Sequence, residues 1–353
     1  MKNGKNNFDS LKKLFKNSPT IPINKKDRVL IISDFHMGDG GSTDDFIPNS
    51  DLLIYALREF YLPKNYTLIL NGDVEELQRF DYKKINKRWK EVYKLFDEFN
   101  AKGLLYKTIG NHDIGLLSKE SPTTNYELHE GIVLNYKEND IFIFHGHQAS
   151  AKYNKHNALV GYTLRYLANP LGIKNYSVAH NSRKKFKIEK STYNFASKQK
   201  VVAIIGHTHR PLFESLPKSE RLRYKIEELC RNYSEVSKEE SKAVKKLIDI
   251  YKKELKKLYK EDKTEGEQDI YNSFIHLPCL FNSGCVIGKR GITALEISKG
   301  EISLVHWFDK KTSKKYLKHN GYDPIQIGTS DYFKMLINKE KLSYIFTRIN
   351  LLT

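Results

Sequence analysis

Five short fragments of the chain combine side chains that commonly bind divalent metal ions. Each holds carboxylate, imidazole or amide groups: Ser33-Asp34-Phe35-His36, Asn71-Gly72-Asp73, Gly110-Asn111-His112-Asp113, His145-Gly146-His147 and Gly206-His207-Thr208-His209. Oxygen and imidazole ligands suit Mn, Fe, Zn or Mg, and the absence of cysteine ligands argues against a structural zinc site. One such fragment is common by chance, but five of them together indicate a single metal site.

Each fragment follows a short apolar run. Runs of four to six residues rich in Ile, Leu and Val predict buried strands, at 29–33, 66–70, 105–109, 141–144 and 201–205. Helical patterns at 51–61 and 85–101 indicate an α/β layered fold, and two expected hairpins, at 132–144 and 292–308, make the sheet arrangement mixed. Ligands collect beyond the carboxyl ends of strands in such folds, so we expect the five fragments to meet there.

The chain resembles the calcineurin-like metallophosphoesterase superfamily in an ordered set of motifs: Asp34-x-His36, Gly72-Asp73, Gly110-Asn111-His112-Asp113, His145 and Gly206-His207-x-His209. The resemblance spans residues 29–210, with later strands up to about Phe308 completing the domain. It implies a four-layer α/β/β/α sandwich that holds two divalent ions, Mn being the first expectation and Fe, Zn or Mg the alternatives. By position, one ion would be held by Asp34, His36 and His209. The other would be held by Asn111, His145 and His207, with Asp73 bridging the two.

The resemblance also implies hydrolysis of a phosphate ester or pyrophosphate. Two ions that share Asp73 can hold a bridging hydroxide at neutral pH and align it for in-line attack. His112 is expected to protonate the leaving oxygen as the general acid, with Asp113 fixing its tautomer. The alternative for Asp113 is a cap of the turn after the strand.

Four further residues are candidate substrate contacts: His147, Arg79, Arg165 and Arg183. His145 is assigned as the ligand of its triplet because it directly follows the strand, which leaves His147 as a neighbour of the ligands, a substrate contact or an ordinary surface histidine. Arg79, six residues past Asp73, could clamp a phosphate or lie on a helix surface.

Charge and hydropathy divide the chain into a core and four added segments. The core is expected at 29–147 and 201–309, and the added segments are a basic lead-in at 1–28, a basic helical cap at 148–200, a charged helical insertion at 214–265 and a C-terminal extension at 310–353. Apolar residues at helical spacing in 214–265 predict a long amphipathic helix or a helical hairpin on the surface.

The chain carries 60 Lys and Arg against 42 Asp and Glu, a net charge of +18. Eleven basic residues and one acid fall in the 148–200 segment, so a cationic cap would concentrate an anionic substrate at the site. A nuclease or nucleic-acid-binding phosphodiesterase that uses this cap is the alternative, and its affinity would fall steeply with salt. A metal-containing binding module without turnover is disfavoured, because it has no need of a proton donor at His112.

The inserted cap also resembles the lid of UDP-2,3-diacylglucosamine pyrophosphatases. That branch commonly has Arg where this chain has His112, and it lacks a long charged arm like 214–265. No apolar stretch approaches the roughly 18 residues of a membrane helix, and no secretory signal is visible. Cys230, Cys279 and Cys285 show no metal-ligand spacing, which predicts a reducing, cytoplasmic setting.

Overall fold

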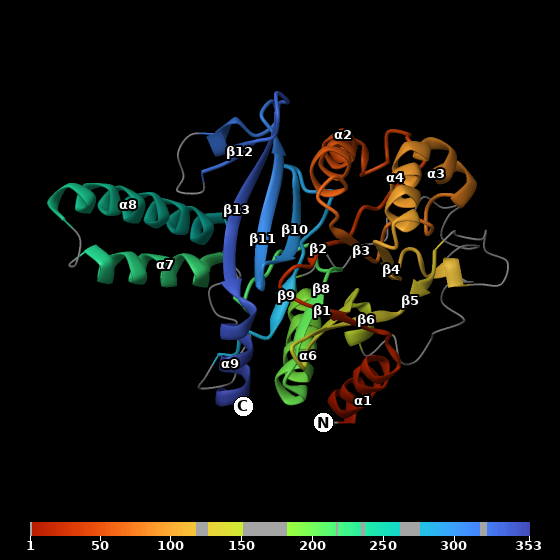
Figure 1. Ribbon diagram of the computed structural model, residues 1–353, viewed down its shortest axis with the longest axis horizontal. Coiled ribbons are helices and arrows are strands. Elements are labelled where there is room, and N and C mark those ends of the chain that lie inside the picture. Colours follow the sequence, from red (N-terminus) through yellow and green to blue (C-terminus); the bar gives the residue numbers. More distant parts are fainter. Residues whose placement is uncertain are drawn as a thin grey trace.

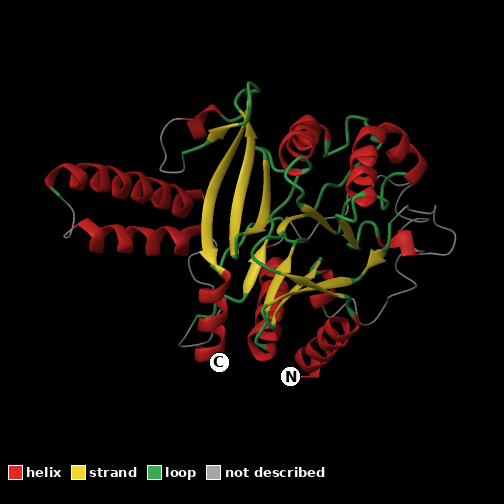
Figure 2. Ribbon diagram, viewed as in Figure 1, coloured by secondary structure: helices red, strands yellow, loops and turns green. Residues whose placement is uncertain are grey.

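The computed structural model describes residues 2–117, 126–150, 182–216, 218–233, 237–261, 276–317 and 323–353. Within these residues two mixed β-sheets pack against each other, and helices cover their outer faces (Figures 1 and 2). The predicted mixed α/β sandwich is therefore confirmed. Of the helices described, none combines the length and hydropathy that a bilayer crossing requires.

The eight-stranded sheet has the order β12-β13-β11-β10-β2-β3-β4-β5. Its strands are β2 (Arg28–Ile32), β3 (Thr67–Asn71), β4 (Leu105–Thr108), β5 (Leu128–His129), β10 (Ile292–Ser298), β11 (Glu301–Asp309), β12 (Ile325–Gln326) and β13 (Tyr332–Lys341). The strands β2 to β5 pair in parallel, whereas β10 to β13 pair antiparallel. Because side chains alternate along a strand, Val29 and Ile31 enter the core between the sheets, while Leu30 and Ile32 pack under the outer helices.

The five-stranded sheet has the order β1-β6-β7-β8-β9. Its strands are β1 (Thr20–Ile23), β6 (Gly131–Tyr136), β7 (Asn139–Phe144), β8 (Val202–Ile205) and β9 (Leu280–Asn282). The pairs β6–β7 and β10–β11 are antiparallel neighbours joined by short turns, which confirms both predicted hairpins. The parallel strands β7, β8 and β9 are apolar and buried, as expected for strands covered on both faces.

The outer face of the eight-stranded sheet is covered by α2 (Ile47–Tyr55), its π-helical continuation at Ala56–Tyr61, α3 (Tyr82–Arg88) and α4 (Lys90–Ala101). The helical pattern expected at 85–101 is thus interrupted at Trp89, whose indole Nε1 donates to Gly38 O at 2.9 Å. At the start of α3, Asp81 accepts from Lys83 N–H and caps the helix. Short 3₁₀ turns occupy Ile114–Leu117, His147–Ala149 and Lys314–Leu317.

The five-stranded sheet is covered by α1 (Lys2–Asn17) and α6 (Ser182–Gln199). The helix α6 makes up most of the described part of the expected cap, and it packs on the sheet through Ile188, Phe195 and Ala196. Residues 151–181 of that expected cap lie outside the described residues. At the other end of the chain, β13 pairs with β11, and α9 (Leu342–Leu352) packs against the core between the sheets. The boundaries between core and added segments stay predictions.

The segment expected as a charged insertion forms a helical hairpin. Its two helices, α7 (Lys218–Tyr233) and α8 (Lys238–Glu261), contact each other along their length and project sideways from the sheets (Figure 1). This is the second of the two forms that the amphipathic pattern predicts.

Candidate metal centre

The predicted ligands lie in loops that leave the carboxyl ends of parallel strands. Hydrogen bonds join these loops directly: Asp34 N–H donates to Gly72 O at 3.1 Å, and Gly206 N–H donates to His145 O at 2.9 Å. Five of the predicted ligands have left-handed backbone, with φ between 48° and 62°: Asp34, His36, Asp73, His207 and His209. The chain therefore turns sharply at each of these residues, and the turns bring residues of both sheets together.

The first cluster of ligand atoms comprises Asp34, His36 and His209, which all lie within 4.8 Å of one another. His209 Nε2 is 3.1 Å from Asp34 Oδ1 and 3.2 Å from His36 Nε2. Glu76 Oε2 accepts from His36 Nδ1 at 2.9 Å, which leaves the Nε2 lone pair facing the cluster.

The second cluster comprises Asp73, His145 and His207, also within 4.8 Å. His145 Nδ1 donates to Asn71 O at 2.8 Å, so the tautomer is fixed and Nε2 faces Asp73 Oδ2 at 3.0 Å. The same carboxylate oxygen lies 3.9 Å from His36 Nε2 of the first cluster. Asp73 thus stands between the two clusters, as a bridging ligand must.

Asn111 supplies the test of whether a metal fits. Its amide Oδ1 is buried and has no hydrogen-bond partner among the described residues, although a buried amide oxygen ordinarily has one. Carboxylate, imidazole and amide oxygen are together a donor set for hard or borderline divalent ions. The residues present therefore fit two divalent cations.

Charges within the centre set the protonation states of its acids. Burial acts to raise the pKa of Asp73, but His145 and His112 outweigh it and hold that pKa well below its usual range. For Glu76, burial is likewise outweighed, by hydrogen bonds from His112 and His36, which lower its pKa to about 2. His207 has the opposite balance: burial and the charge of His145 lower its pKa to about 3, so its imidazole is neutral and able to bind a metal.

The structure corrects the predicted partner of His112. Its Nδ1 donates to Glu76 Oε1 at 2.8 Å, and not to Asp113. The carboxylate of Asp113 accepts from Val74 N–H at 2.8 Å and from Gly110 N–H at 2.6 Å, so it fixes the loop backbone. Asp113 thus plays the turn-capping part that was its alternative. Burial acts to lower the pKa of His112, but Asp73 and Glu76 raise it to about 9.

Glu76 is the functional residue that sequence reasoning missed. It contacts His36 through one carboxylate oxygen and His112 through the other. The signal in the sequence is the acidic pair Glu75-Glu76, which follows Asp73 by two and three residues. Both carboxylates are buried, which is unusual for glutamate.

The helix α6 contacts the loop that carries His207 and His209. Its Glu189 is fully buried, accepts from Thr208 Oγ1 at 3.0 Å and pairs with Arg210. Glu189 is the one acid of the basic 148–200 segment. The Glu189 carboxylate thereby holds Thr208, which lies between the predicted ligands His207 and His209.

The four substrate candidates lie in different surroundings. His147 is buried, with its ring 5.5 Å from that of His145, and burial lowers its pKa well below the usual value. Arg79 donates to Thr43 O at 2.7 Å and pairs with Asp45 at 3.2 Å, so it holds the loop after β2. Arg183 is exposed on α6, and Arg165 lies outside the described residues. Substrate contact stays a prediction for all four.

The family model described as calcineurin-like phosphoesterase matches residues 27–233. The matched segment includes all five ligand fragments and ends at the last residue of α7. Among curated proteins, none is similar enough to match.

Proposed function

The chain belongs to the calcineurin-like phosphoesterase family and is a metal-dependent phosphoesterase, and from that premise we propose that it hydrolyses a phosphate ester or pyrophosphate at a centre of two divalent ions. The observation that supports this most is the position of Asp73 between two clusters of ligand atoms. One ion would be held by Asp34, His36 and His209, the other by Asn111, His145 and His207. Two such ions, with Mn the first expectation, would polarise phosphate oxygens and lower the pKa of bound water.

His112 is the proposed general acid. Its Nδ1 is committed to Glu76, so Nε2 is the nitrogen that can deliver a proton to a leaving oxygen. The ring lies 4.6 Å from the ring of His36, which places it beside the first cluster. Glu76 touches both rings, and its role is therefore to position the donor relative to the ligand.

The nitrogen atoms of the ligand histidines are held by their other contacts. Asn71 O fixes the tautomer of His145, and Glu76 does the same for His36. The centre is therefore prepared to receive cations on defined lone pairs.

The cytoplasmic location expected from the cysteines stays a prediction.

Hydrolysis of p-nitrophenyl phosphate and bis-p-nitrophenyl phosphate with Mn tests the proposal. Asp73→Asn and His112→Ala should both lose turnover, but only Asp73→Asn should also lose bound metal, measured by mass spectrometry of the protein. His306→Gln, a buried histidine on β11 outside both clusters, is the control and should keep both. Equal turnover in all four proteins would overturn the mechanism. The ratio of the turnover rates for the two substrates separates a monoesterase from a diesterase.

A further inference from the structure

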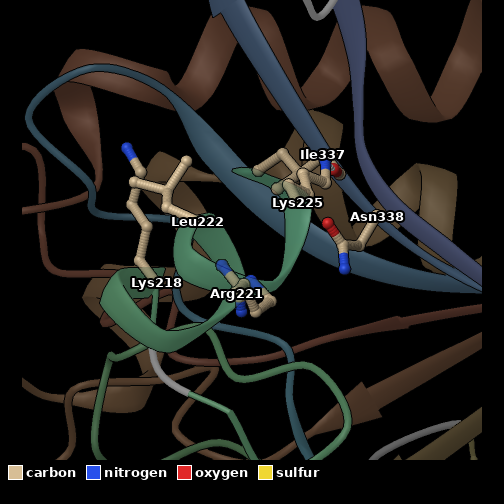
Figure 3. A pocket seen from close by; sticks show the side chains of 6 residues that line it. All are labelled: Lys218, Arg221, Leu222, Lys225, Ile337 and Asn338. Atoms are coloured by element: carbon tan, nitrogen blue, oxygen red, sulfur yellow. Dashed lines mark hydrogen bonds between the residues drawn. The ribbon is translucent and has the colours of Figure 1, made fainter. Parts of the chain in front are cut away.

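The hairpin of α7 and α8 is fixed where it leaves the sheets. Lys225 Nζ donates to Ile337 O of β13 at 3.1 Å, and Arg221 donates to Leu216 O at 3.2 Å. Figure 3 shows six side chains around one cavity: Lys218, Arg221, Leu222 and Lys225 of α7, and Ile337 and Asn338 of β13. Its volume is about 10 Å³, which is room for a single water molecule, so the cavity is not a ligand site. The contacts around it attach the hairpin to the sheet.

The helix α8 has an apolar side that faces α7. Val244, Leu247, Tyr251, Leu255 and Leu258 recur at spacings of three and four residues and share that side. Tyr251 is buried, and Lys225 Nζ of α7 lies 5.8 Å from the centre of its ring. A salt bridge between Lys218 and Glu254 also joins the two helices. The direction of α8 is therefore set by its packing on α7.

The opposite side of α8 is a lysine face. We define it by exposed side chains at helical spacing over residues 242–257: Lys242, Lys245, Lys246, Lys253, Lys256 and Lys257, with Asp249 among them. The first five form no ion pair with another residue that the structure describes. Four of these lysines, with Asp249 and Ile250, line a shallow hollow of about 480 Å³.

Like charges three or four residues apart on a helix repel each other and destabilise it. Lys242 and Lys246 stand in this relation, as do Lys253 and Lys257. An ordinary solvated helix face mixes both signs, as α7 does with its pairs Arg223–Glu220 and Arg231–Glu227. The lysine face of α8 is thus a concentration of positive charge that an anionic partner would relieve.

We propose that the lysine face of α8 binds the phosphate backbone of nucleic acid without regard to base sequence. Residues 242–257 extend about 22 Å at 1.5 Å per residue. Duplex DNA carries one negative charge per roughly 1.7 Å of its axis with both strands counted, so this length of duplex holds about a dozen phosphates, and those on the side that faces the helix would lie within reach of these lysines. Lysine acts as a point charge toward phosphate, and such contacts position a duplex without reading its bases.

An anionic membrane is less well matched to the same face. Helices that lie on bilayers insert an apolar side, and the apolar side of α8 packs on α7. Among the described residues, the exposed large apolar side chains of this hairpin are Tyr224 and Tyr233, both on α7. This inference concerns a surface outside the metal centre, and it does not depend on the proposed reaction.

Binding of the full chain to a fluorescent 20-base-pair DNA duplex tests the proposal. The measurement is fluorescence anisotropy in EDTA, over sodium chloride from 50 to 200 mM, so that no hydrolysis interferes. Three variants are compared with the wild type: the triple Lys245→Gln/Lys246→Gln/Lys253→Gln, the same three positions changed to Arg, and a matched triple on α3, Lys83→Gln/Lys84→Gln/Lys87→Gln. The three α3 lysines are also exposed on a helix, so the control removes the same charge.

The log–log salt slope should fall in magnitude by about 2.7 in the α8 glutamine triple, because each lost phosphate contact removes about 0.9. Its affinity at 50 mM salt should fall more than tenfold, while the arginine triple and the α3 triple stay within about threefold of wild type. Thermal melting checks that each variant is folded. The proposal is overturned if the wild type fails to bind, if the α8 and α3 triples lose equally, or if vesicles with phosphatidylserine bind through these lysines more tightly than DNA does.

Discussion

Lys107 Nζ lies 2.6 Å from each carboxylate oxygen of Glu75, and both side chains are fully buried. Tyr93 OH also donates to Glu75 at 2.9 Å. In the sequence, Glu75 lies between Asp73 and Glu76. Lys107 lies on β4, just before the loop that carries Asn111 and His112. The pair therefore ties together the two loops that carry Asp73 and His112, the proposed bridging ligand and the proposed proton donor.

Breaking this pair should be costly. Lys107→Met leaves Glu75 as a buried charge without its cation, and we expect a loss of about 3–5 kcal/mol in the free energy of unfolding. Urea denaturation measures it. The double variant Lys107→Met/Glu75→Gln should recover part of that loss, because Glu75 then no longer leaves a buried charge without its partner. A loss below about 1 kcal/mol in the single variant would contradict the interpretation.

Glu76 and Asp113 can be told apart by their variants. Glu76→Gln should lower kcat or metal affinity about 10- to 100-fold, since it disturbs His112 and His36 together. Asp113→Asn should chiefly lower the melting temperature, because its carboxylate accepts from two backbone N–H groups. Steady-state kinetics and thermal melting measure both effects. If Asp113→Asn impairs turnover as Glu76→Gln does without loss of stability, the assignment of Asp113 as a turn cap is wrong.

Gly110 gives a steric test of the bridging ligand. A Cβ atom at this position would lie 2.1 Å from Asp73 Oδ1, a distance that forces the carboxylate to move. Gly110→Ala should therefore lose bound metal and turnover. Gly115→Ala is the matched control, because the nearest atom to its Cβ would be Leu77 Cδ1 at 3.9 Å. Metal analysis of both purified proteins checks this, and full metal content in Gly110→Ala would speak against it.

Metal binding should stabilise the folded chain. A ligand that binds only the native state adds about 2.7 kcal/mol at a concentration of 100 times its Kd. The melting temperature of wild type should rise with added MnCl₂ and return to its metal-free value in EDTA. Asp73→Asn should show a much smaller rise. Equal rises in both proteins would mean that the metal binds elsewhere.

The three cysteines should differ in reactivity. Burial raises the pKa of the Cys279 thiol to about 12, so at pH 8 almost no thiolate forms there, whereas Cys230 is exposed on α7. Labelling with Ellman's reagent at pH 8 should modify Cys230 first and Cys279 only after unfolding. Cys230→Ser should remove the fast phase. Rapid modification of Cys279 in the folded protein would contradict its burial.

The clustering of the Asp and His side chains could be predicted from local patterns, because each fragment follows a strand whose apolar run is plain in the sequence. Glu76 could not be assigned, because its partners His36 and His112 are distant in the chain and meet only in the fold. The pairing of His112 with Asp113 failed for a related reason. Adjacent side chains point in different directions, and Asp113 turned to backbone groups.

The helix α6 and the strand β13 show a second limit. The basic composition of 148–200 predicts a cap, which stays a prediction, but it did not indicate that Glu189 is buried or that the apolar residues of α6 pack on the five-stranded sheet. The strand β13 is partly exposed along its length, so its polar residues hide the alternation that marks a strand. In both cases the structure of the segment depends on the element it packs on, which its composition does not reveal.

The left-handed backbone at five ligand residues has a consequence for how the centre could change. Such conformations are costly for residues other than glycine and persist only where the surrounding structure enforces them. The positions of the donor atoms are thus a property of the main chain and the sheets beneath it. We therefore expect that one divalent ion could replace another without a change in the scaffold, and that selectivity between metals would depend on ligand chemistry and metal supply.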